Sequence, residues 1–423
     1  MSKQISGFSK FTKEEKINWL ATTFFTNKKE GISTLKSYWN SDEKLQSLHD
    51  DFIENTISNF YFPYAVAPNF IINGRNYTVP MAIEESSVVA AAALVAKFWS
   101  TRGGFKTTVI NTEKIGQVHF MYNGNFKDLT AYFESKKQAL LDATDAITKN
   151  MRTRGGGILA IELRDKTTEL ENYYQLHVTF NTKDSMGANF INSCLEVMAN
   201  VFKKEDINIV MSILSNYVPN CLVRAEVSCK VTELFNKNAE LYAQKFIHAI
   251  NIANAEPHRA VTHNKGIMNG IDAVVLATGN DFRAVEAGVH AYASRSGKYK
   301  SLSGAKIENG MFSFWLEIPL ALGTVGGLTK LHPLAKLSLE ILQNPSANEL
   351  MEIVAVVGLA QNFAALRALT TTGIQHGHMK MHLGNIIKQL TTNKKETQYL
   401  LDFFSDKTVT HSAVVAEYER VFK

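Results

Sequence analysis

Residues 257–270 concentrate ionisable side chains inside sequence that is otherwise apolar. The segment reads PHRAVTHNKGIMNG, and half of its fourteen side chains are polar or ionisable. That composition suits neither a core helix nor a flexible loop. A lysine beside glycine usually marks a solvated turn, but Lys265 is followed by Ile267 and Met268 and then by an apolar, strand-like run at 273–277. We therefore take this segment as a candidate functional site.

A second candidate is the glutamate pair that enters the apolar stretch IEESSVVA at 83–90. A carboxylate at the start of a helix is often only a charge that matches the helix dipole. The alternative is that Glu85 is a buried carboxyl group, ready to act as an acid. Both interpretations place Glu85 directly before a buried helix over 88–99, entered from Ser86 and Ser87 because serine caps helix starts.

A third polar cluster, ATGNDFR at 277–283, precedes a predicted helix over 284–293. Asn280 or Asp281 would be an ordinary N-cap for that helix. Read alone, this segment is structural.

The fourth cluster, GIQHGHMKMH at 373–382, contains His378 and His382, which could share a helix face as metal ligands. No carboxylate or cysteine lies nearby to complete the site. A metal-dependent hydrolase is kept only as an alternative, and we expect no metal.

The segment DSMGAN at 184–189 joins a predicted strand to a predicted helix. Glycine at a helix start lets backbone N–H groups approach a pyrophosphate, and the helix dipole favours the anion. No GxGxxG motif follows a strand, so a Rossmann site is not predicted. Walker A, HExxH and GxSxG motifs are also absent from the sequence.

The elements expected around these segments indicate an α+β protein. Residues 10–60 predict short amphipathic helices, and Asn73-Gly74 predicts a hairpin turn within 69–80. A β-α-β-β-α-β order between 111 and 216 predicts an inserted ferredoxin-like domain. Its expected strands are 116–122, 158–163, 173–180 and 207–214, and its expected helices are 129–150, capped by Asp128, and 186–202. A further apolar helix is expected at 353–369.

Composition narrows the class of protein. The chain has 423 residues, of which 45% are hydrophobic and 20% charged, so it is globular and long enough for several domains. The net charge of +5 is diffuse, which gives no support for nucleic-acid binding. Three cysteines without metal-site spacing indicate a reduced, cytoplasmic protein. The longest apolar run has about nine residues, too few to span a bilayer, so no membrane partner is expected.

These segments together resemble class II hydroxymethylglutaryl-coenzyme A reductases, the soluble bacterial form. The resemblance runs over nearly the whole chain and rests on ENTISNFYFPYAVAPNF (54–70), EESSVVAAA (84–92), GGFKT (103–107), DSMGAN (184–189), SILSN (212–216), HRAVTHNKGIMNGID (258–272), ATGNDFRAVEAGVHAYASRSG (277–297), GTVGG (323–327), VGLAQNFAALRAL (357–369) and GIQHGHM (373–379). Many long motifs in one order make the resemblance specific.

The resemblance implies roles for individual residues. The catalytic residues fall on Glu85, Lys265, Asp281 and His378. The residues that hold the acyl group fall on Ser87, Arg259 and Asn269. The residues that hold the dinucleotide fall on Asp184, Met186, Gly187, Ala188, Asn189 and Asn216.

The resemblance also implies an architecture. A large, mostly helical substrate domain (1–110 and 217–374) carries the inserted cofactor domain (111–216), and a helical flap (375–423) follows. Active sites are shared across a homodimer or a dimer-based hexamer.

The implied reaction is the four-electron reduction of the hydroxymethylglutaryl-coenzyme A thioester to mevalonate and coenzyme A, through a hemithioacetal and mevaldehyde, in the mevalonate pathway of isoprenoid biosynthesis. Lys265 would polarise the carbonyl oxygen, Glu85 would donate a proton, and Asp281 would sit between these two and tune them. His378 would protonate the departing thiolate, since a histidine titrates near ~6.5 and a thiol near ~8.5. The oxidative direction, in mevalonate catabolism, and a non-catalytic coenzyme A-binding scaffold are the alternatives.

Two positions depart from the family pattern. Ser86 replaces the proline expected between Glu85 and Ser87, which frees the turn that carries the glutamate. Thr148 occupies the position, seven before the triple glycine, where relatives that select NADH carry an acidic residue. Because Lys149, Arg152 and Arg154 lie near it and could bind a 2′-phosphate, NADPH is favoured over NADH, which stays possible.

Overall fold

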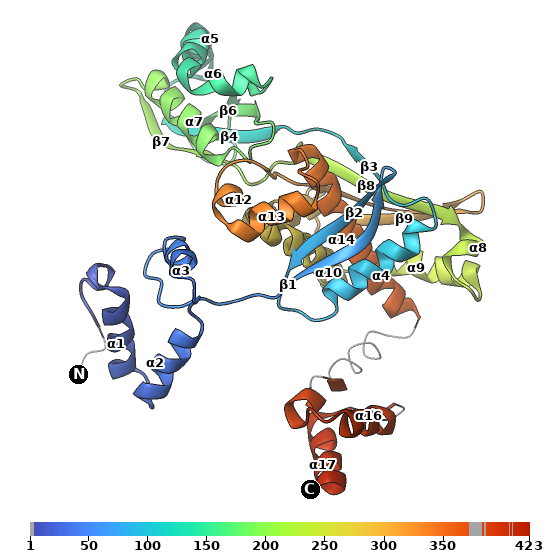
Figure 1. Cartoon of the computed structure of the whole chain (residues 1–423). Coiled ribbons are helices and arrows are strands. Elements are labelled where there is room, and N and C mark those ends of the chain that lie inside the picture. The colour runs from blue at the N-terminus through green and yellow to red at the C-terminus, as the bar shows by residue number, and fades with distance from the viewer. Residues whose placement is uncertain (1–3, 372–382, 385, 406, 408) are drawn as a thin grey trace. The chain divides into compact units, whose positions relative to one another are not determined.

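The computed structural model describes residues 4–371, 383–384, 386–405, 407 and 409–423. The chain forms two compact units, Met1–Pro63 and Tyr64–Lys423. The first is helical, as expected, and contains a 3-10 turn at Phe8–Lys10 followed by α1 (Lys13–Thr23), α2 (Lys28–Ser37) and α3 (Glu43–Asp50) (Figure 1). Thr12 and Glu15 form a capping box at the start of α1, and Lys13 joins α1 to Asp50 through a 2.7 Å ion pair.

The second unit begins with a hairpin and the helix that leads from it. Strands β1 (Tyr64–Ile72) and β2 (Arg75–Ala82) pair antiparallel around Asn73 and Gly74, which both have positive φ, as a type I′ turn requires. The predicted turn is confirmed. Helix α4 (Val88–Ser100) is also confirmed, but its expected serine cap is wrong, because no Ser87 side-chain hydrogen bond caps the helix.

A four-stranded antiparallel sheet in this unit was not expected from the sequence. Its strands are β3 (Lys106–Val109), β8 (Leu222–Lys230), β9 (Ser303–Glu308) and β10 (Met311–Pro319), in the order β3-β8-β10-β9. Buried and exposed positions alternate along β8 and β10, so the period-two pattern was present in the sequence.

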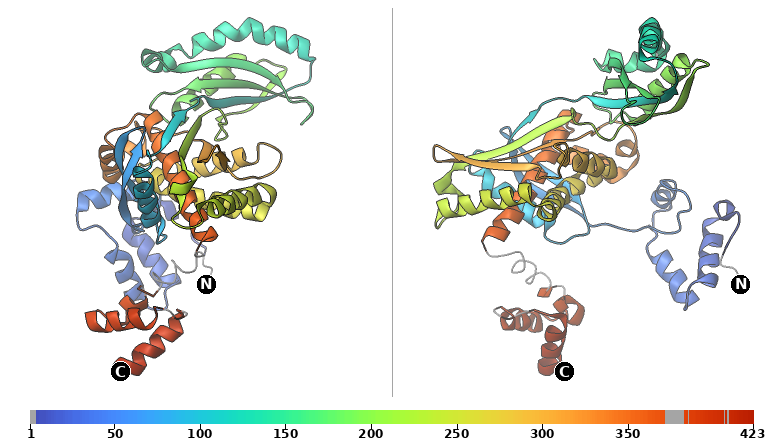
Figure 2. Two further views of the ribbon diagram at one scale, coloured as in Figure 1. Left: turned by 90° about the vertical axis from the view of Figure 1, so that its right-hand side faces the viewer. Right: turned by 180° about the vertical axis from the view of Figure 1, so that it is seen from behind.

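Helices surround this sheet and share one hydrophobic core with it and with the hairpin. They are α8 (Val231–Leu234), α9 (Ala239–Ala255), α10 (Pro257–Ala277), α11 (Phe282–Ala293) and α14 (Ala347–Thr370). The helices α12 (Leu328–Leu331) and α13 (Pro333–Ile341) contact each other, and α13 also packs against β2 and α10. Helix α14 packs against α10, α4 and β8 (Figure 2). It is long and apolar enough to cross a membrane, but 67% of its most apolar window is buried in the protein, as in a core helix.

The strand-like run expected at 273–277 is wrong, because α10 continues through it as one helix of 21 residues. The run is apolar on every side because several elements surround this end of the helix. A short apolar run is equally compatible with a buried strand and a buried helix.

The residues between these elements form the expected ferredoxin-like arrangement. Strands β4 (Lys114–Tyr122), β5 (Gly157–Asp165), β6 (Tyr173–Asn181) and β7 (Ile207–Leu214) make an antiparallel sheet in the order β5-β6-β4-β7, and it has its own core. Helices α5 (Phe126–Ala143), α6 (Asp145–Thr153) and α7 (Ala188–Phe202) complete it (Figure 1). The single helix expected over 129–150 is wrong, since the chain breaks at Thr144 and Asn125, not Asp128, caps α5.

Near the C-terminus, α16 (Lys394–Phe403) and α17 (His411–Phe422) carry the polar helical pattern expected there. Their apolar side chains form a third, separate hydrophobic cluster.

Candidate functional site

The Glu85 carboxylate and the Lys265 ammonium form an ion pair. Lys265 Nζ lies 2.9 Å from Glu85 Oε2, and the Asn269 amide nitrogen lies 3.4 Å from the same oxygen. Lys265 and Asn269 are four residues apart on α10, so they share one face of the helix. The expectation that Glu85 is buried is wrong for the single chain, because its side chain is 39% exposed and that of Lys265 61%. Both groups therefore remain open to a substrate.

Ser87 places a hydroxyl group two residues from Glu85. It begins α4 with φ of +79°, a left-handed conformation that costs a non-glycine residue about 1–2 kcal/mol. Its Oγ atom is buried and has no hydrogen-bond partner among the residues that the structure describes. A buried hydroxyl without a partner costs free energy unless a ligand satisfies it. A polar group of the substrate would provide that partner.

Helix α10 is held in place by polar side chains on its other faces. Asn264 donates to the Lys300 carbonyl oxygen and accepts from the Leu302 amide. His263 Nε2 lies 2.8 Å from the Ser303 hydroxyl, and burial lowers the pKa of His263 to about 3. His263 is therefore a neutral, structural histidine at neutral pH.

The glycines of this segment allow helices to pack closely. A Cβ atom at Gly270 would lie 2.8 Å from the Val357 carbonyl oxygen of α14. The unusual composition of residues 257–270 thus reflects three faces of one helix. One face is anchored by polar side chains, one packs closely against α14, and one carries the lysine that pairs with Glu85.

Arg259 lies in the first turns of the same helix and is half-buried. Desolvation lowers the pKa of its guanidinium group. No hydrogen bond from this guanidinium occurs within the described residues. Its positive charge is thus available to an acidic group of a ligand.

Asp281 lies at the far end of α10 from Lys265. The Asn280 amide bonds to the Val275 carbonyl, and ten residues of helix separate Val275 from Lys265, roughly 15 Å at ~1.5 Å per residue. The Asp281 carboxylate caps α11 by accepting from the Arg283 and Ala284 amides. Among the described residues it makes no contact with Lys265 or Glu85, so its N-cap interpretation is the one that the single chain displays.

His378 and His382 lie outside the described residues. Within the described part of the chain, no group of three or more histidine, cysteine, aspartate or glutamate side chains could hold a metal ion.

The DSMGAN segment forms a tight turn that leads into α7. Gly187 has φ of +91°, and a Cβ atom there would lie 2.5 Å from the Thr182 side chain. It precedes Ala188, the first residue of α7, and within the described part of the chain no side-chain hydrogen bond caps this helix, so its first amide groups can donate to an anion. Asn189 is exposed in this first turn.

Asp184 performs a structural task in this turn. Its carboxylate accepts from the Ala347 amide at the start of α14, and its carbonyl oxygen accepts from the Thr324 amide. A Cβ atom at Gly323 would lie 2.4 Å from the Met186 nitrogen, so the GTVGG segment also needs glycine to approach the turn.

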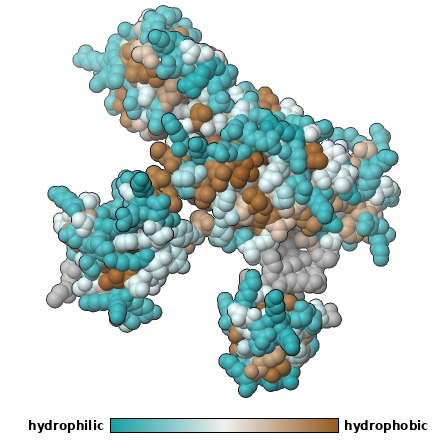
Figure 3. All heavy atoms as spheres, viewed as in Figure 1, coloured by the Kyte–Doolittle hydropathy of each residue, from teal (hydrophilic) through white to brown (hydrophobic). Residues whose placement is uncertain are grey.

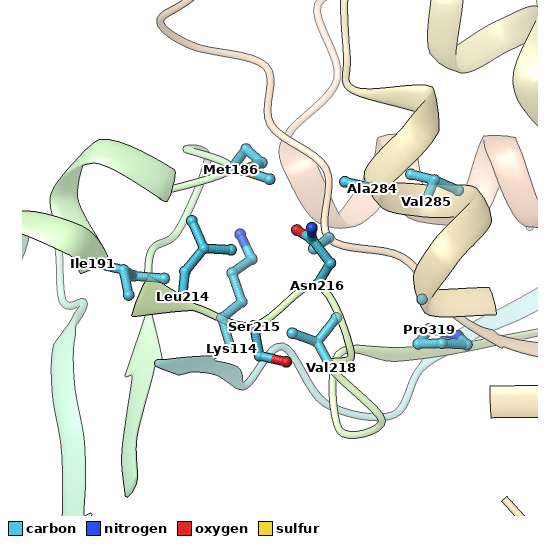
Figure 4. A pocket seen from close by; sticks show the side chains of 12 residues that line it. Lys114, Met186, Ile191, Leu214, Ser215, Asn216, Val218, Ala284, Val285 and Pro319 are labelled. Carbon is cyan, nitrogen blue, oxygen red and sulfur yellow. The ribbon is translucent and has the colours of Figure 1, made fainter. Parts of the chain in front are cut away.

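A small pocket joins the end of β7 to α11 and contains two of the expected cofactor residues, Met186 and Asn216 (Figure 4). It also contains Lys114, which the sequence analysis did not single out. Lys114 is only 5% exposed, and its ammonium donates to Thr182 Oγ1 at 2.6 Å and to the Ser185 carbonyl oxygen at 2.8 Å.

The position expected to govern cofactor choice faces inward. Thr148 is buried, and its hydroxyl donates to the Thr144 carbonyl oxygen within α6. Arg152 forms a 2.6 Å ion pair with Asp145 and packs against Gly157, while Arg154 donates to the Asn150 carbonyl oxygen. Unlike Thr148, the side chains of Lys149, Arg152 and Arg154 are exposed to solvent.

Comparisons with known proteins agree with this arrangement. The family described as hydroxymethylglutaryl-coenzyme A reductase matches residues 13–383. The 3-hydroxy-3-methylglutaryl-coenzyme A reductase of Archaeoglobus fulgidus is 39% identical over 395 residues, which cover 91% of this chain and 87% of that protein. A probable reductase of the same name from Borreliella burgdorferi is 35% identical over 387 residues, covering 90% and 88%.

Solved structures extend the likeness to the fold. A class II reductase from Streptococcus pneumoniae, bound to NADPH in open conformations, matches with a TM-score of 0.74 and 35% identity, covering 93% of this chain and 99% of that one. A second structure of the reductase from that organism matches with a TM-score of 0.75 and 36% identity over 99% of this chain and all of that one. With a family match across most of its length and relatives this similar over nearly all of theirs, the chain belongs to the hydroxymethylglutaryl-coenzyme A reductase family, and within it to class II.

Proposed function

We propose that this chain is a hydroxymethylglutaryl-coenzyme A reductase that converts the thioester to mevalonate and releases coenzyme A. The observation that carries the proposal is the accessible Glu85–Lys265 ion pair with Asn269 beside it on the same face of α10. The buried Ser87 hydroxyl, two positions along the chain from Glu85, has no partner among the described residues and supports the same site. The nearby Arg259 guanidinium offers a positive charge for the carboxylate end of the acyl group.

The chain's own groups match the needs of the reaction. Negative charge develops on the same carbonyl oxygen in both reduction steps, and the Lys265 ammonium can stabilise it. Glu85 is 2.9 Å from Lys265 and can give the proton that the oxygen finally needs. His378 is proposed to protonate the coenzyme A thiolate as it leaves, and Asp281 to tune Lys265 and Glu85.

The turn at residues 184–189, together with Asn216, fits a dinucleotide. The start of α7 offers amide donors, Gly187 lets the turn lie against the Thr182 side chain, and buried Lys114 supplies positive charge beside the turn. When bound, the nicotinamide supplies hydride. NADPH is the favoured form, as in the streptococcal structure, and NADH remains open.

A homodimer with shared active sites is part of the proposal, and a hexamer of such dimers is the larger alternative. The position of Asp281, roughly 15 Å of helix away from Lys265, supports a second copy as its source at this site. Apolar side chains also gather on an exposed face over α12 and α13 (Figure 3). They include Val325, Leu328, Leu331, Leu334 and Leu337, each more than 40% exposed. A contiguous patch of this kind marks an interaction surface.

We propose a cytoplasmic location without a membrane or nucleic-acid partner.

The test is absorbance at 340 nm on mixing the protein with hydroxymethylglutaryl-coenzyme A and NADPH, then with NADH. Two cofactors should be oxidised for each coenzyme A released, and EDTA should have no effect. A ratio of one to one would show that the reaction stops at the aldehyde. Activity lost in EDTA and restored by zinc would instead support the metal-dependent hydrolase alternative. The oxidative direction is tested by the reverse assay with mevalonate, coenzyme A and oxidised cofactor, and a far larger kcat/KM there than for thioester reduction would favour the catabolic alternative.

A further inference from the structure

Lys114 is a buried lysine without a carboxylate partner. It is 5% exposed at the start of β4, and no ion pair to it occurs among the described residues. Taking an ammonium group out of water is costly unless an opposite charge compensates it. A neutral side chain could brace the same turn without that cost. Asp184 lies near enough to offset part of this cost but forms no ion pair with Lys114, so an anion bound beside Lys114 would supply the remaining compensation.

The surroundings of Lys114 place it beneath the cofactor turn. Its two hydrogen bonds go to Thr182 Oγ1 and to the Ser185 carbonyl oxygen, and Thr182 Oγ1 itself donates to that carbonyl at 2.6 Å. These three groups fix the turn from inside. The Thr182 side chain also lies directly against Gly187. The hydrogen bonds that fix Thr182 therefore also support Gly187, the residue before α7.

The pocket offers the missing anion a place. Figure 4 shows the Lys114 side chain among Leu214, Asn216 and Met186, at the wall of the pocket that the turn borders. An ammonium has three N–H donors, and two are used within the chain. The uncapped amide groups at the start of α7 point to the same kind of ligand, an anion.

We propose that Lys114 is a further positioning residue of the cofactor site: it braces the turn at residues 182–185 and places a fixed positive charge beneath the phosphate groups of the dinucleotide. The inference rests on the proposed function for the identity of the dinucleotide. It adds a residue to that site and a pH limit to its affinity.

The pH limit follows from the groups that face Lys114. Desolvation lowers the pKa of Lys114 to about 8. The nearby Cys221 and Asp184 act in the opposite direction, but their effect on this pKa is smaller. The pKa of Cys221 is raised to about 11 by burial, so its thiol stays protonated up to that range. The phosphate groups of the ligand are fully ionised above about pH 7. Loss of the Lys114 charge should therefore weaken cofactor binding as the pH rises through about 8.

The experiment compares Lys114→Met, Lys114→Arg and Thr182→Val with Lys204→Met, a control at an exposed lysine of the same domain that pairs with Asp206. The Kd for NADPH is measured without the second substrate by quenching of protein fluorescence, from pH 6.5 to 9.5. KM and kcat are measured over the same range for NADPH and for hydroxymethylglutaryl-coenzyme A.

Lys114→Met should raise the Kd and KM for NADPH by about tenfold or more, the loss expected for a hydrogen bond to a charged group. The KM for hydroxymethylglutaryl-coenzyme A should stay within about twofold, and Lys204→Met should behave as the wild type. The wild-type Kd should rise above pH 8, whereas Lys114→Arg, which keeps its charge, should show a flat profile. Thr182→Val, which removes one partner but keeps the cation, should weaken binding less than Lys114→Met.

Thermal unfolding separates this role from a purely structural one. Removing a buried, uncompensated charge should leave the Tm of Lys114→Met unchanged or higher. An unchanged Kd for NADPH, or equal losses for both substrates together with a lower Tm, would overturn the proposal. Because the Kd needs no turnover, a wild-type protein that bound NADPH but failed to reduce the thioester would refute the proposed function and leave this test intact.

Discussion

At the scale of single residues, the site depends on two opposite charges carried by independently fixed elements. Glu85 sits in the turn between β2 and α4, while Lys265 belongs to α10, whose buried face is anchored through Asn264 and His263. Neither group has to order itself around the substrate. Pre-organised charge of this kind lowers the reorganisation needed as an oxyanion forms. The exposure of the pair in one chain leaves both groups accessible to a carbonyl group of the substrate.

We expect Lys265→Met to disable both reduction steps, because both place negative charge on one oxygen. The loss in kcat should be about 10²–10³-fold for each half-reaction. Steady-state rates with hydroxymethylglutaryl-coenzyme A and with free mevaldehyde measure it. Lys298→Met, a change at an exposed lysine beyond α11, is the matched control and should retain full activity. Mevaldehyde reduction near the wild-type rate would contradict the assignment of Lys265.

His378 should matter in only one half of the reaction. Its proposed task is to protonate the thiolate, which arises when the thioester is cleaved and not when the aldehyde is reduced. His378→Gln should therefore slow thioester reduction by roughly 10²–10⁴-fold, the range for loss of a general acid, and mevaldehyde reduction far less. Equal losses in both assays, with the fold verified by circular dichroism, would refute this role.

His263 should make the fold sensitive to acid. Its folded pKa of about 3 lies below the value near ~6.5 of an unfolded chain, so between these values the unfolded state binds the proton more tightly. The free energy of unfolding is therefore not reduced by His263 above about pH 6.5. Below that pH it falls by up to ~1.4 kcal/mol per pH unit. Urea unfolding between pH 7 and 5 should show a shallower pH dependence for His263→Gln than for His248→Gln, an exposed control. Equal slopes would mean that other groups cause the acid sensitivity.

Sequence motifs selected several residues that the structure brings together, although their roles remain predictions, and the motifs gave no signal for groups that only the fold places side by side. Glu85, Lys265 and Asn269 were selected from two segments about 180 positions apart, and they meet in the structure. Lys114 begins the strand KIGQVHFMY, and nothing in that pattern distinguishes a buried cation from an ordinary lysine at a strand end. Its burial depends on the turn at 182–185, which is distant in sequence.

At the scale of elements, periodicity predicted the ferredoxin-like unit and the hairpin, because each strand there has one buried face and clear turn residues around it. Helix α10 was misread in part. Its first half mixes three functional faces and its second half is buried on every side, so neither half shows the one-sided pattern of a surface helix. The four-stranded sheet was not predicted, although β8 and β10 alternate, because β3, β8 and the β9–β10 pair are far apart in sequence and no local pattern indicates that they pair.

Helix α6 should contribute to cofactor choice through Arg152. The Arg152 side chain packs against Gly157 and is paired with Asp145, and both partners are more than half exposed. If the guanidinium meets a 2′-phosphate, Arg152→Ala should raise the KM for NADPH more than that for NADH, by about tenfold or more in their ratio. Arg154→Ala tests the neighbouring residue in the same way.

Asp145→Ala is the matched control, because it releases Arg152 without removing it. Its KM for NADPH should be unchanged or lower. Equal effects of Arg152→Ala on both cofactors would leave the arginine as ordinary surface charge, which is the usual status of an exposed ion pair.

At the scale of the whole molecule, one chain presents an incomplete set of the proposed catalytic groups. Glu85 and Lys265 are together, while Asp281 caps α11 at the other end of α10. The proposed symmetric pair of chains would complete the set, because an isologous interface brings different parts of the same surface from two copies face to face. The apolar side chains over α12 and α13, close in sequence to the GTVGG segment, provide a surface for such a contact.

This arrangement can be tested by mixing two inactive variants. If each site combines Lys265 of one chain with Asp281 of the other, a hybrid of Lys265→Met and Asp281→Asn chains has one site with both changes and one site with neither. Random exchange of equal amounts makes half of the dimers hybrids, each with one intact site of two, so about a quarter of the wild-type activity should return. Each variant alone should stay inactive, and exchange is confirmed by separating differently tagged chains. Mixtures of Lys265→Met with Glu85→Gln should regain no activity, because Lys265 and Glu85 of each site come from the same chain. Under the proposed sharing both sites of that hybrid carry a defect, so it stays inactive and serves as the negative control. Full exchange with no recovered activity in the Lys265–Asp281 mixture would show that Asp281 acts on its own chain or not at all.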